Sequence, residues 1–488
     1  MMSYESKFQP KLFYYHLNRE KRIPQNHILR KIKEKINFDF VYAEVKDTYG
    51  INGNVSVPPP VILKLMLLLI LYNVRSEREL MDTISLRLDW LWFLGYDLDS
   101  EIPNHSVLSK ARARWGVKAF KAFFERIVSQ CVQEGLVEGR KLFIDTSLIE
   151  ANASNNSVVD TQSLGRYLKK GYRELEERLE GLTEGKKGKA NERYLSTTDP
   201  DASVVRHGRG KSKLRYKTHR VVDNKKEVVT ATKVTTGSVD DGDMLKEMIE
   251  QAEGNTGQKV EVVVGDSRYG TKENFLMCGE RKIKAHLANL EETNRGRGRQ
   301  EGIFPKEAFR YDREKDIFIC PAGEVLRRRH FYQGRQNYEY KAGKGVCRRC
   351  KLRMECTRAK DGRTLKRHIR QEELERLVEL AGSAEARRDR KIRQHLSERS
   401  FAQSIRYGYK RARWRRLWRV QIQDYLIAVV QNIQVLLKEG GRRAANAARE
   451  LRKERLFLYP KGLSTIWQTC WDIFWDSEIR IDRSFAII

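Results

Sequence analysis

The sequence contains few cysteines and prolines and no hydrophobic run that could cross a membrane. Its 488 residues include 7 Cys and 10 Pro. The most apolar segment, residues 61–72, is about half as long as the roughly 20 residues that a bilayer requires, and Lys64 interrupts it. The first residues lack the apolar core of a signal peptide. Four of the seven cysteines fall in one segment, which argues against a disulfide framework and for a reducing compartment. We therefore expect a cytoplasmic protein without a membrane partner.

Acidic residues are too few to balance the basic ones. The chain has 95 Lys and Arg against 65 Asp and Glu, a formal net charge of +30. Hydrophobic residues make up 40%, which is enough for folded cores and excludes disorder throughout the chain. A large, folded and strongly basic protein indicates a polyanionic partner, nucleic acid above all. The alternative is a generic basic protein such as a ribosome-associated factor.

Residues 1–135 have the pattern of a helical domain. Apolar residues recur at helical spacing in segments 61–73, 77–94 and 117–132. A further short helix is predicted over 106–115, and its size and charge are similar to those of a helix-turn-helix DNA reader. We expect three basic side chains on its exposed side: Lys110, Arg112 and Arg114. The alternative is an ordinary helical domain with a solvated basic face.

From residue 141 the pattern changes to alternating strands and helices. A short strand over 141–146 ends next to Asp145, and a near-continuous apolar strand over 259–267 ends next to Asp266. Between them, alternation of apolar and polar residues predicts a hairpin of 214–223 and 227–236. Further predicted elements are a surface excursion with a helix near 167–182, helices at 240–253 and 270–279, a strand at 282–289, an irregular basic stretch at 290–370 and a helical region at 371–438. This order predicts an α/β fold.

Three acids stand out by their position in this pattern. Asp145 and Asp266 lie at the ends of neighbouring central strands and would point into the same crevice, and Glu398 lies on a later helix. Carboxylate ligands of this kind suit Mg²⁺ or Mn²⁺. Two such ions, about 3.5–4 Å apart, can support phosphoryl transfer. Any one acid could equally be a solvated surface residue among the 65 acids of the chain.

Several segments together resemble the DDE transposases of bacterial insertion sequences. They are FIDTSLIEANAS at 143–154, STTDPDASVV and YKTHRVVD within 196–223, VVGDSRYGTKENF at 263–275, and SERSFAQ at 397–403 with RLWRVQIQDYLIAVVQNIQ after it. The segment that begins PPPVILKLMLLLILYNVRSE is similar to the N-terminal domain of these transposases. The resemblance covers about residues 5–440.

The resemblance implies an RNase H-like mixed-sheet core in which Asp145, Asp266 and Glu398 form the DDE triad with two Mg²⁺ or Mn²⁺ ions. Such an enzyme binds terminal inverted repeats of double-stranded DNA, cleaves the element ends and transfers the strands to target DNA, as a homodimer or larger assembly associated with the bacterial nucleoid. The implied domains are a helical DNA-binding domain (1–135), the first part of the core (136–290), an inserted basic Cys-rich subdomain (291–370), the helical last part of the core (371–440) and a tail (441–488).

The sequence departs from the family pattern around Glu398. Many relatives carry Tyr and Arg seven and four residues before this Glu and Lys about seven residues after it. Here these positions are Lys391, Gln394 and Ile405, although Arg393 and Arg406 lie one residue away. The departure leaves open a catalytically inactive, transposase-derived DNA-binding protein. A metal-dependent nuclease without strand transfer is a third hypothesis, which the length of the resemblance disfavours.

Two more features complete the predicted site residues. Four cysteines in an Arg-rich segment have spacing typical of a structural zinc site, with free thiols as the alternative: Cys320, Cys347, Cys350 and Cys356. Residues 387–419 hold 13 Lys and Arg against two acids, as expected of a phosphate-binding strip. The further DNA-contacting candidates are Lys217, His219, Arg393, Arg406, Arg411, Arg413, Arg415 and Arg416.

Overall fold

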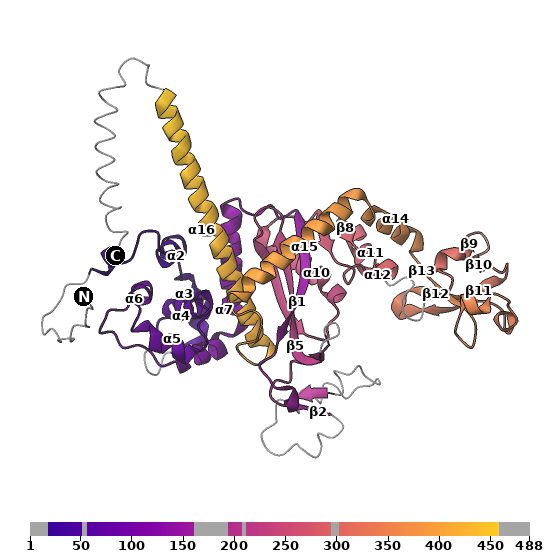
Figure 1. The fold of residues 1–488 in the computed structure, drawn as a ribbon, viewed down its shortest axis with the longest axis horizontal. Helices are drawn as coiled ribbons and strands as arrows, with labels where there is room; N and C mark the ends of the chain where they lie inside the picture. Colours follow the sequence, from indigo (N-terminus) through magenta and orange to yellow (C-terminus); the bar gives the residue numbers. More distant parts are fainter. Residues whose placement is uncertain (1–17, 51–55, 161–193, 207–210, 294–301, 458–488) are drawn as a thin grey trace, which may run out of the picture. The chain divides into compact units, whose positions relative to one another are not determined.

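The computed structural model describes residues 18–50, 56–160, 194–206, 211–293 and 302–457 (Figure 1). The helix predicted near 167–182 and most of the tail at 441–488 lie outside the described residues. Contacts divide the chain into two units, unit 1 of residues 1–433 and unit 2 of residues 434–488. Within the described residues, no helix is both long and apolar enough to cross a membrane.

The N-terminal region of unit 1 is helical. Its elements are α1 (Arg19–Arg22), α2 (Ile28–Lys35), α3 (Phe40–Val45), α4 (Pro59–Leu71), α5 (Glu77–Ile84), α6 (Leu88–Leu94) and α7 (Ser106–Gln133). Helix α4 begins with prolines, which the first turn of a helix tolerates, and it is buried almost all round. The segment 77–94, predicted as one helix, is divided between α5 and α6. In α7, Gly116 adopts φ 62° and ψ −159°, so the predicted short helix over 106–115 ends there and a second helix follows.

A mixed sheet forms the centre of the unit. In the order β6-β5-β1-β7-β8 it consists of β6 (Val229–Thr236), β5 (Lys213–Asp223), β1 (Lys141–Glu150), β7 (Val262–Gly265) and β8 (Lys284–Leu287), and β4 (Ser203–Val205) pairs with the start of β5. Strand β5 runs in the direction opposite to all the other strands of this sheet. The predicted strand over 141–146 is too short, because β1 pairs with β5 as far as Glu150. Asp145 therefore lies inside the strand. A separate ribbon pairs β2 (Val158–Asp160) with β3 (Tyr194–Ser196).

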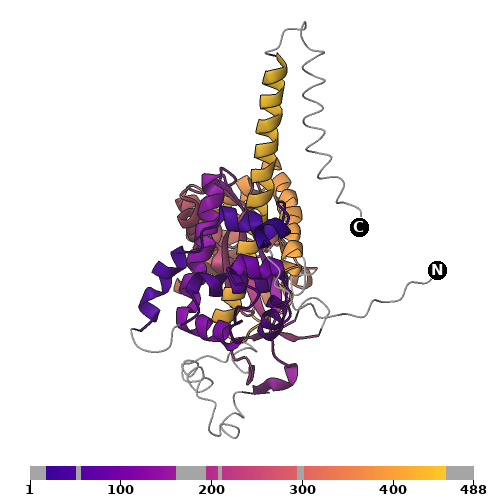
Figure 2. The ribbon, with the colours of Figure 1, turned by 90° about the vertical axis from the view of Figure 1, so that its left-hand side faces the viewer.

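Helices cover both faces of this sheet (Figures 1 and 2). On one face, α10 (Leu245–Thr256), α11 (Lys272–Glu280) and α14 (Gln371–Ala381) bury the larger apolar core together with side chains of β1, β5 and β7. On the other face, α15 (Ala384–Ile405) contacts β1, β7 and β8. Leu396 of α15 packs there with Phe143, Val262 and Val264. The start of α16 (Leu417–Phe457) covers β5 and β6, where Asn432 hydrogen-bonds the backbone of Val229.

A second sheet occupies residues that the sequence predicts to be irregular. Its strands β9 (Arg310–Asp312), β10 (Ile317–Ile319), β11 (Val325–Tyr332), β12 (Asn337–Lys341) and β13 (Thr364–His368) form an antiparallel sheet around a small core of Phe309, Phe318, Leu326, Tyr340 and Leu365. The prediction was wrong because β11 is exposed along most of its length. Its run of Arg and aromatic residues therefore shows no alternation between a buried and a solvated face.

Candidate active site

Asp145 lies on β1, and Asp266 directly follows β7, the parallel neighbour of β1. Phe143 of β1 pairs with Val264 of β7. Asp145 and Asp266 each lie two residues further along the chain, so they are level with each other. Alternate residues of a strand share a face, and Phe143 and Val264 both pack under α15. Because neighbouring strands lie about 4.8 Å apart, the two carboxylates meet on the face covered by α15.

The charge of this pair is only partly balanced. Arg393 of α15 forms an ion pair with Asp145, with 2.8 Å between Nη1 and Oδ2, and the amide of Thr146 donates to Asp145 Oδ1. The pKa of Asp145 is nevertheless raised, mainly by burial and further by the negative charge of Asp266. A pair of carboxylates with a surplus of negative charge is the arrangement that a divalent cation would relieve.

The turn after β7 holds Asp266 in place. The amide of Arg268 donates to Asp266 Oδ1 at 2.9 Å. The buried side chain of Tyr269 reaches β1, where its hydroxyl lies 3.2 Å from Thr146 Oγ1. Gly270 passes so close to β8 that a Cβ there would lie 1.9 Å from the carbonyl oxygen of Ala288. The glycine and tyrosine of the GDSRYG segment thus fix the chain that carries the second aspartate.

Glu398 lies on α15, but on its solvated side. Its neighbours Leu396, Ser397 and Ser400 are buried against the sheet, whereas Glu398 is exposed and accepts a hydrogen bond from Gln394 Nε2 at 3.2 Å. In the part of the chain that the structure describes, no hydrogen bond or ion pair joins Glu398 to Asp145 or Asp266. The structure therefore brings the two aspartates together and places the glutamate on the helix beside them, outside their contacts.

A second acid cluster, which sequence reasoning missed, lies under the first half of α15. Asp389 is 4% exposed. Both of its oxygens accept from Lys141 Nζ, at 3.0 and 2.9 Å, and Oδ2 lies 2.7 Å from His286 Nδ1. Among the described residues, His286, Glu385 and Asp389 are the acids and imidazoles whose ligand atoms gather within 4.8 Å of one another. Because Lys141 already occupies the position of a cation, we interpret this cluster as an ion-pair network that fixes α15 on β1 and β8.

A third buried ionic contact ties α16 to the sheet. Arg220 of β5 and Asp424 of α16 are both almost fully buried and pair at 2.8 Å. Arg220 also donates to Ser404 Oγ of α15 and to Gln431 Oε1. These contacts explain the polar residues in the otherwise apolar DYLIAVVQN segment. In the sequence, these buried contacts are signalled by the polar residues that interrupt an apolar helix.

Four of the predicted DNA-contacting residues are buried or engaged inside the fold. Arg112 is 3% exposed, so the prediction that it lies on an exposed face is wrong. Arg413 donates to the Val74 carbonyl and to Asn73.

Lys217 and His219 lie on the face of the sheet opposite Asp145, because Asp145 is in register with Arg220 and alternate residues change face. Lys217 is buried against Asp241 at 2.7 Å. His219 is fully buried, and burial lowers its pKa to about 4. Neither side chain can reach a DNA phosphate in this structure.

Other predicted contacts do face solvent. Exposed members of the set are Lys110, Arg114, Arg406, Arg411 and Arg415, and Arg416 is half-buried. Arg415 Nε donates to the carbonyl of Asn152 at 3.1 Å. Arg393 of α15 does not belong to this exposed set, because its guanidinium forms an ion pair with Asp145.

The four clustered cysteines lie near one another beside the second sheet. Cys320 follows β10, and its sulfur accepts the amide of Glu324 at 3.3 Å. Burial raises the pKa of the Cys356 thiol, and the nearness of Cys347, Cys320 and Cys350 raises it further. A Cβ at Gly362 would lie 2.7 Å from the Cys347 sulfur, so this glycine leaves room for the thiol. In the described residues, no three of these sulfurs lie within 4.8 Å of one another.

Comparisons with known proteins identify the two ends of this arrangement. A family model described as a transposase domain (DUF772) matches residues 17–114, and one described as a transposase DDE domain matches residues 319–437. The second range includes Glu398, while Asp145 and Asp266 lie between the two. No curated protein matches the chain.

Among solved structures, the chain is similar to a piggyBac transposase determined by cryo-electron microscopy in a synaptic complex with hairpin DNA, at 10% identity and a TM-score of 0.26. That match covers 62% of this chain and 58% of the other, and a likeness this slight carries no argument. The two family models place a transposase domain and a transposase DDE domain in this chain, which supports a DDE transposase of the insertion-sequence type.

Proposed function

We propose that the protein binds the terminal inverted repeats of its insertion sequence, hydrolyses a phosphodiester at each element end, and uses the freed 3′-hydroxyl to attack target DNA. The observation that carries the proposal is the pair Asp145 and Asp266, each two residues beyond the paired Phe143 of β1 and Val264 of β7 in the mixed sheet. Glu398 on the helix above them completes the triad. Two element ends must be paired for such a reaction, which requires at least a homodimer.

The residues present fit a divalent metal. Carboxylate oxygens are the ligands that Mg²⁺ and Mn²⁺ prefer, and burial together with the charge of Asp266 raises the pKa of Asp145 despite the nearby Arg393. Asp145 and Asp266 would hold the metal, with Glu398 as the third acid. When bound, two such ions supply charge stabilisation for the attacking and leaving oxygens of phosphoryl transfer.

Arg393 gives α15 a second role in this site. Its guanidinium pairs with Asp145 and neutralises part of the charge of that carboxylate. A metal cation and Arg393 therefore compete for the same carboxylate. Released from Asp145, the guanidinium would be free to bind a DNA phosphate, for which its planar fork is suited.

The second candidate is a DNA-binding protein derived from a transposase but without catalysis. Lys391, Gln394 and Ile405, which depart from the family pattern, are all exposed on α15. Gln394 donates to Glu398, which directs one carboxylate oxygen along the helix. A cleavage assay separates the two candidates.

The assay uses DNA that carries the element's own ends and flanks, with Mg²⁺ or Mn²⁺. Asp145→Asn, Asp266→Asn and Glu398→Gln each remove one negative charge with little change of shape. We expect end cleavage to fall by orders of magnitude while binding of the ends persists. An intact wild-type chain that cuts no end DNA would support the inactive derivative, and normal cutting by Glu398→Gln would remove this residue from the triad.

We further propose that residues 291–370 form an inserted subdomain that holds a structural Zn²⁺ through Cys320, Cys347, Cys350 and Cys356. An amide that donates to a sulfur, as Glu324 does to Cys320, is a contact that stabilises a thiolate ligand. Purified protein should contain about one zinc per chain, bound by four thiolates. Cys350→Ser should lower the zinc content without changing which divalent ion supports cutting, with Cys278→Ser as the control, and zinc-free protein prepared without chelator would contradict the site.

The DNA contacts are proposed to divide between two regions. Lys110 and Arg114, which are exposed on the first half of α7, would read the terminal repeat. Arg406, Arg411, Arg415 and Arg416 would contact phosphates near the triad, where such contacts supply affinity without sequence preference. A fragment of residues 1–135 should keep a preference for the element end over random DNA, measured by fluorescence anisotropy.

A further inference from the structure

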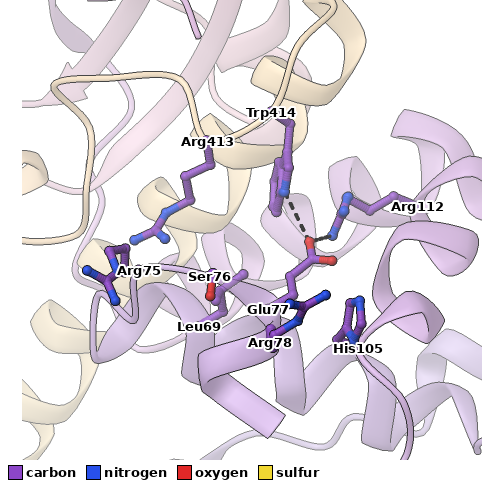
Figure 3. Close-up of a pocket in the computed structure, with 9 residues that line it drawn as sticks. All are labelled: Leu69, Arg75, Ser76, Glu77, Arg78, His105, Arg112, Arg413 and Trp414. Atoms are coloured by element: carbon purple, nitrogen blue, oxygen red, sulfur yellow. Dashed lines mark hydrogen bonds and ion pairs between the residues drawn. The ribbon is translucent and has the colours of Figure 1, made fainter. Parts of the chain in front are cut away.

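A basic pocket lies where the helical N-terminal region meets the loop between α15 and α16. It has a volume of about 460 Å³ and is lined by residues of the α4–α5 turn, the start of α7 and the segment before α16. Figure 3 shows four arginines around it, Arg75, Arg78, Arg112 and Arg413, with Glu77 as the one acid that lines it. With His105 neutral, the lining carries a net charge of +3. The proposed triad does not use this pocket.

One guanidinium group of the pocket is buried and a second is half-buried, both without full compensation. Arg112 is 3% exposed, and its Nε has no hydrogen-bond partner among the described residues. The Nε of Arg413 also lacks a partner in the described part of the chain, and its other nitrogens donate to the neutral oxygens of Val74 and Asn73. Burial lowers the pKa of both side chains. Buried cations are costly unless an anion pairs with them, so the pocket has both room and an electrostatic need for an anion.

The internal acid cannot supply all of that charge. One oxygen of Glu77 accepts from Trp414 Nε1 at 3.0 Å and also pairs with Arg112 Nη1 at 2.5 Å. The cation of Arg112 stacks over the ring of Trp414. Figure 3 shows these three side chains together on one wall, with Arg75, Arg78 and Arg413 around the rest of the pocket. Glu77 thus ties the two regions together. Of the other arginines, Arg75 pairs with Glu79 at 3.5 Å, and Arg413 donates to the neutral oxygens of Val74 and Asn73.

The start of α5, whose first turn carries Glu77 and Glu79, also borders the pocket. Ser76 caps this helix by accepting from the amide of Glu79, and Ser76 lines the pocket. The first turn of a helix favours anions, because its amides point outward and its dipole is positive there. Planar guanidinium groups that converge on a helix N-terminus are suited to the tetrahedral oxygens of a phosphate.

We propose that this pocket binds a phosphate group of the DNA backbone. The inference rests on the proposed function, which supplies DNA as the partner, and it adds a contact that engages both regions at once. Arg413 and Trp414 belong to the loop that follows the helix of Glu398. A phosphate in the pocket would therefore stabilise the packing of the DNA-reading region against the segment next to the triad. Free inorganic phosphate shares this chemistry, and the experiment separates the two sources.

The test uses the full chain and the exposed pocket residue Arg78, whose replacement by Gln should not disturb the core. Arg22→Gln, at an exposed arginine that does not line the pocket, is the matched control. In the first arm, thermal unfolding is followed in sodium phosphate and in sodium chloride at equal ionic strength and pH. Phosphate should raise the melting temperature of the wild type and of Arg22→Gln, and should do so much less for Arg78→Gln.

In the second arm, binding of a duplex with the element's end is measured across salt concentrations. Loss of one phosphate contact should reduce the slope of log K against log salt by about 0.9 and weaken binding roughly tenfold at low salt. Arg22→Gln should change neither quantity. Glu77→Gln removes the internal competitor, so a variant that still folds should bind inorganic phosphate more tightly than the wild type. A role in packing alone does not predict that gain.

The outcomes separate the pocket from the catalytic proposal. An equal effect of phosphate on wild type and Arg78→Gln, together with an unchanged salt slope, overturns the inference. A phosphate effect that depends on Arg78 without any change in DNA binding overturns DNA as the source. If Arg78→Gln reduces the slope but the chain cuts no DNA, the pocket stands and the catalytic proposal fails.

Discussion

Two groups of acids lie beneath the same helix, α15, and they differ in how their charge is balanced. Near the start of the helix, Asp389 is buried and contacted by Lys141 and His286. Further along, Asp145 shares its face of the sheet with a second acid, Asp266.

The comparison separates an acid that holds the fold from acids that can bind a metal. Asp389 has cationic or proton-sharing partners on both of its oxygens, so a metal would have to displace them. Asp145 is paired with Arg393, but Asp266 brings an additional negative charge. Burial with matched partners indicates a structural contact, whereas burial with a surplus of one charge sign indicates a site for an external ion.

The largest expected effect concerns activity. Asp266→Asn should lower metal-dependent end cleavage by at least about a thousandfold, as expected when a residue of a cooperating catalytic group is removed. Asp389→Asn should leave cleavage per folded molecule within a few-fold of wild type, because its carboxylate binds Lys141 and His286. Single-turnover cleavage at saturating Mg²⁺ measures both. Inactive but folded Asp389→Asn would erase the distinction between the two groups.

The effects on the free energy of unfolding should have the opposite order, with the larger loss at Asp389 and the smaller at the Asp145 and Asp266 pair. Asp389→Asn leaves Lys141 and His286 without their acid and should lower the free energy of unfolding by about 3 kcal/mol. Asp145→Asn should change it by no more than about 1 kcal/mol, because loss of the Arg393 pair is offset by relief of repulsion with Asp266. Urea unfolding followed by circular dichroism measures both values. A larger loss for Asp145→Asn than for Asp389→Asn would reverse our interpretation.

The opposite face of the sheet offers a third buried acid, Asp241, matched by Lys217, with His219 nearby. The unfolded chain protonates His219 near its ordinary pKa, whereas burial lowers the folded-state pKa to about 4. The unfolded state therefore binds more protons between these values, and stability is lost as the pH falls through this window. The loss should be about 2 kcal/mol between pH 7.5 and 5. His219→Gln should remove this part of the pH dependence in urea unfolding, and an unchanged pH profile would argue against the buried neutral imidazole.

The smallest effect concerns competition at Asp145. Arg393→Gln removes the cation that shares this carboxylate, so Mn²⁺ should bind the DNA-free protein roughly three- to tenfold more tightly. Lys141→Gln is the matched control in the other cluster and should leave that affinity unchanged. Isothermal titration with Mn²⁺ tests the pair of variants. Weaker binding by Arg393→Gln would mean that the arginine supports the site instead of competing for it.

The order of strands and helices along the chain could be predicted because local pattern determines it, and it also predicted that Asp145 and Asp266 lie close together. The apolar run before Asp266 and the hairpin at 214–236 each indicate a strand within a few residues. Asp389 could not be found in this way, because its partners Lys141 and His286 lie 248 and 103 residues away and α15 reads as one basic strip. The exposure of Glu398 likewise depends on how the helix is rotated on the sheet.

The errors about basic residues have a related cause. Arg112 and Arg413 belong to segments that look solvated in sequence, yet they meet at the pocket between the N-terminal helices and the loop before α16. Asp145 is in register with Arg220, three residues from Lys217. Because alternate residues of a strand change face, Lys217 lies on the face away from Asp145. The net charge of the chain predicts that a basic surface exists. Which arginines form that surface depends on how the helices and loops pack.

The most direct test of the central claim replaces Mg²⁺ by Fe²⁺ and maps where hydroxyl radicals generated at the bound ion cut the polypeptide. Both acid groups lie under α15, so the positions of the cuts distinguish them. Our account predicts cuts near residues 145 and 266, with further cuts on α15 near 398, and their loss in Asp266→Asn but not in Asp389→Asn. Cuts centred on residues 286 and 385–389 that persist in Asp266→Asn would contradict the assignment of the metal to the Asp145 and Asp266 pair.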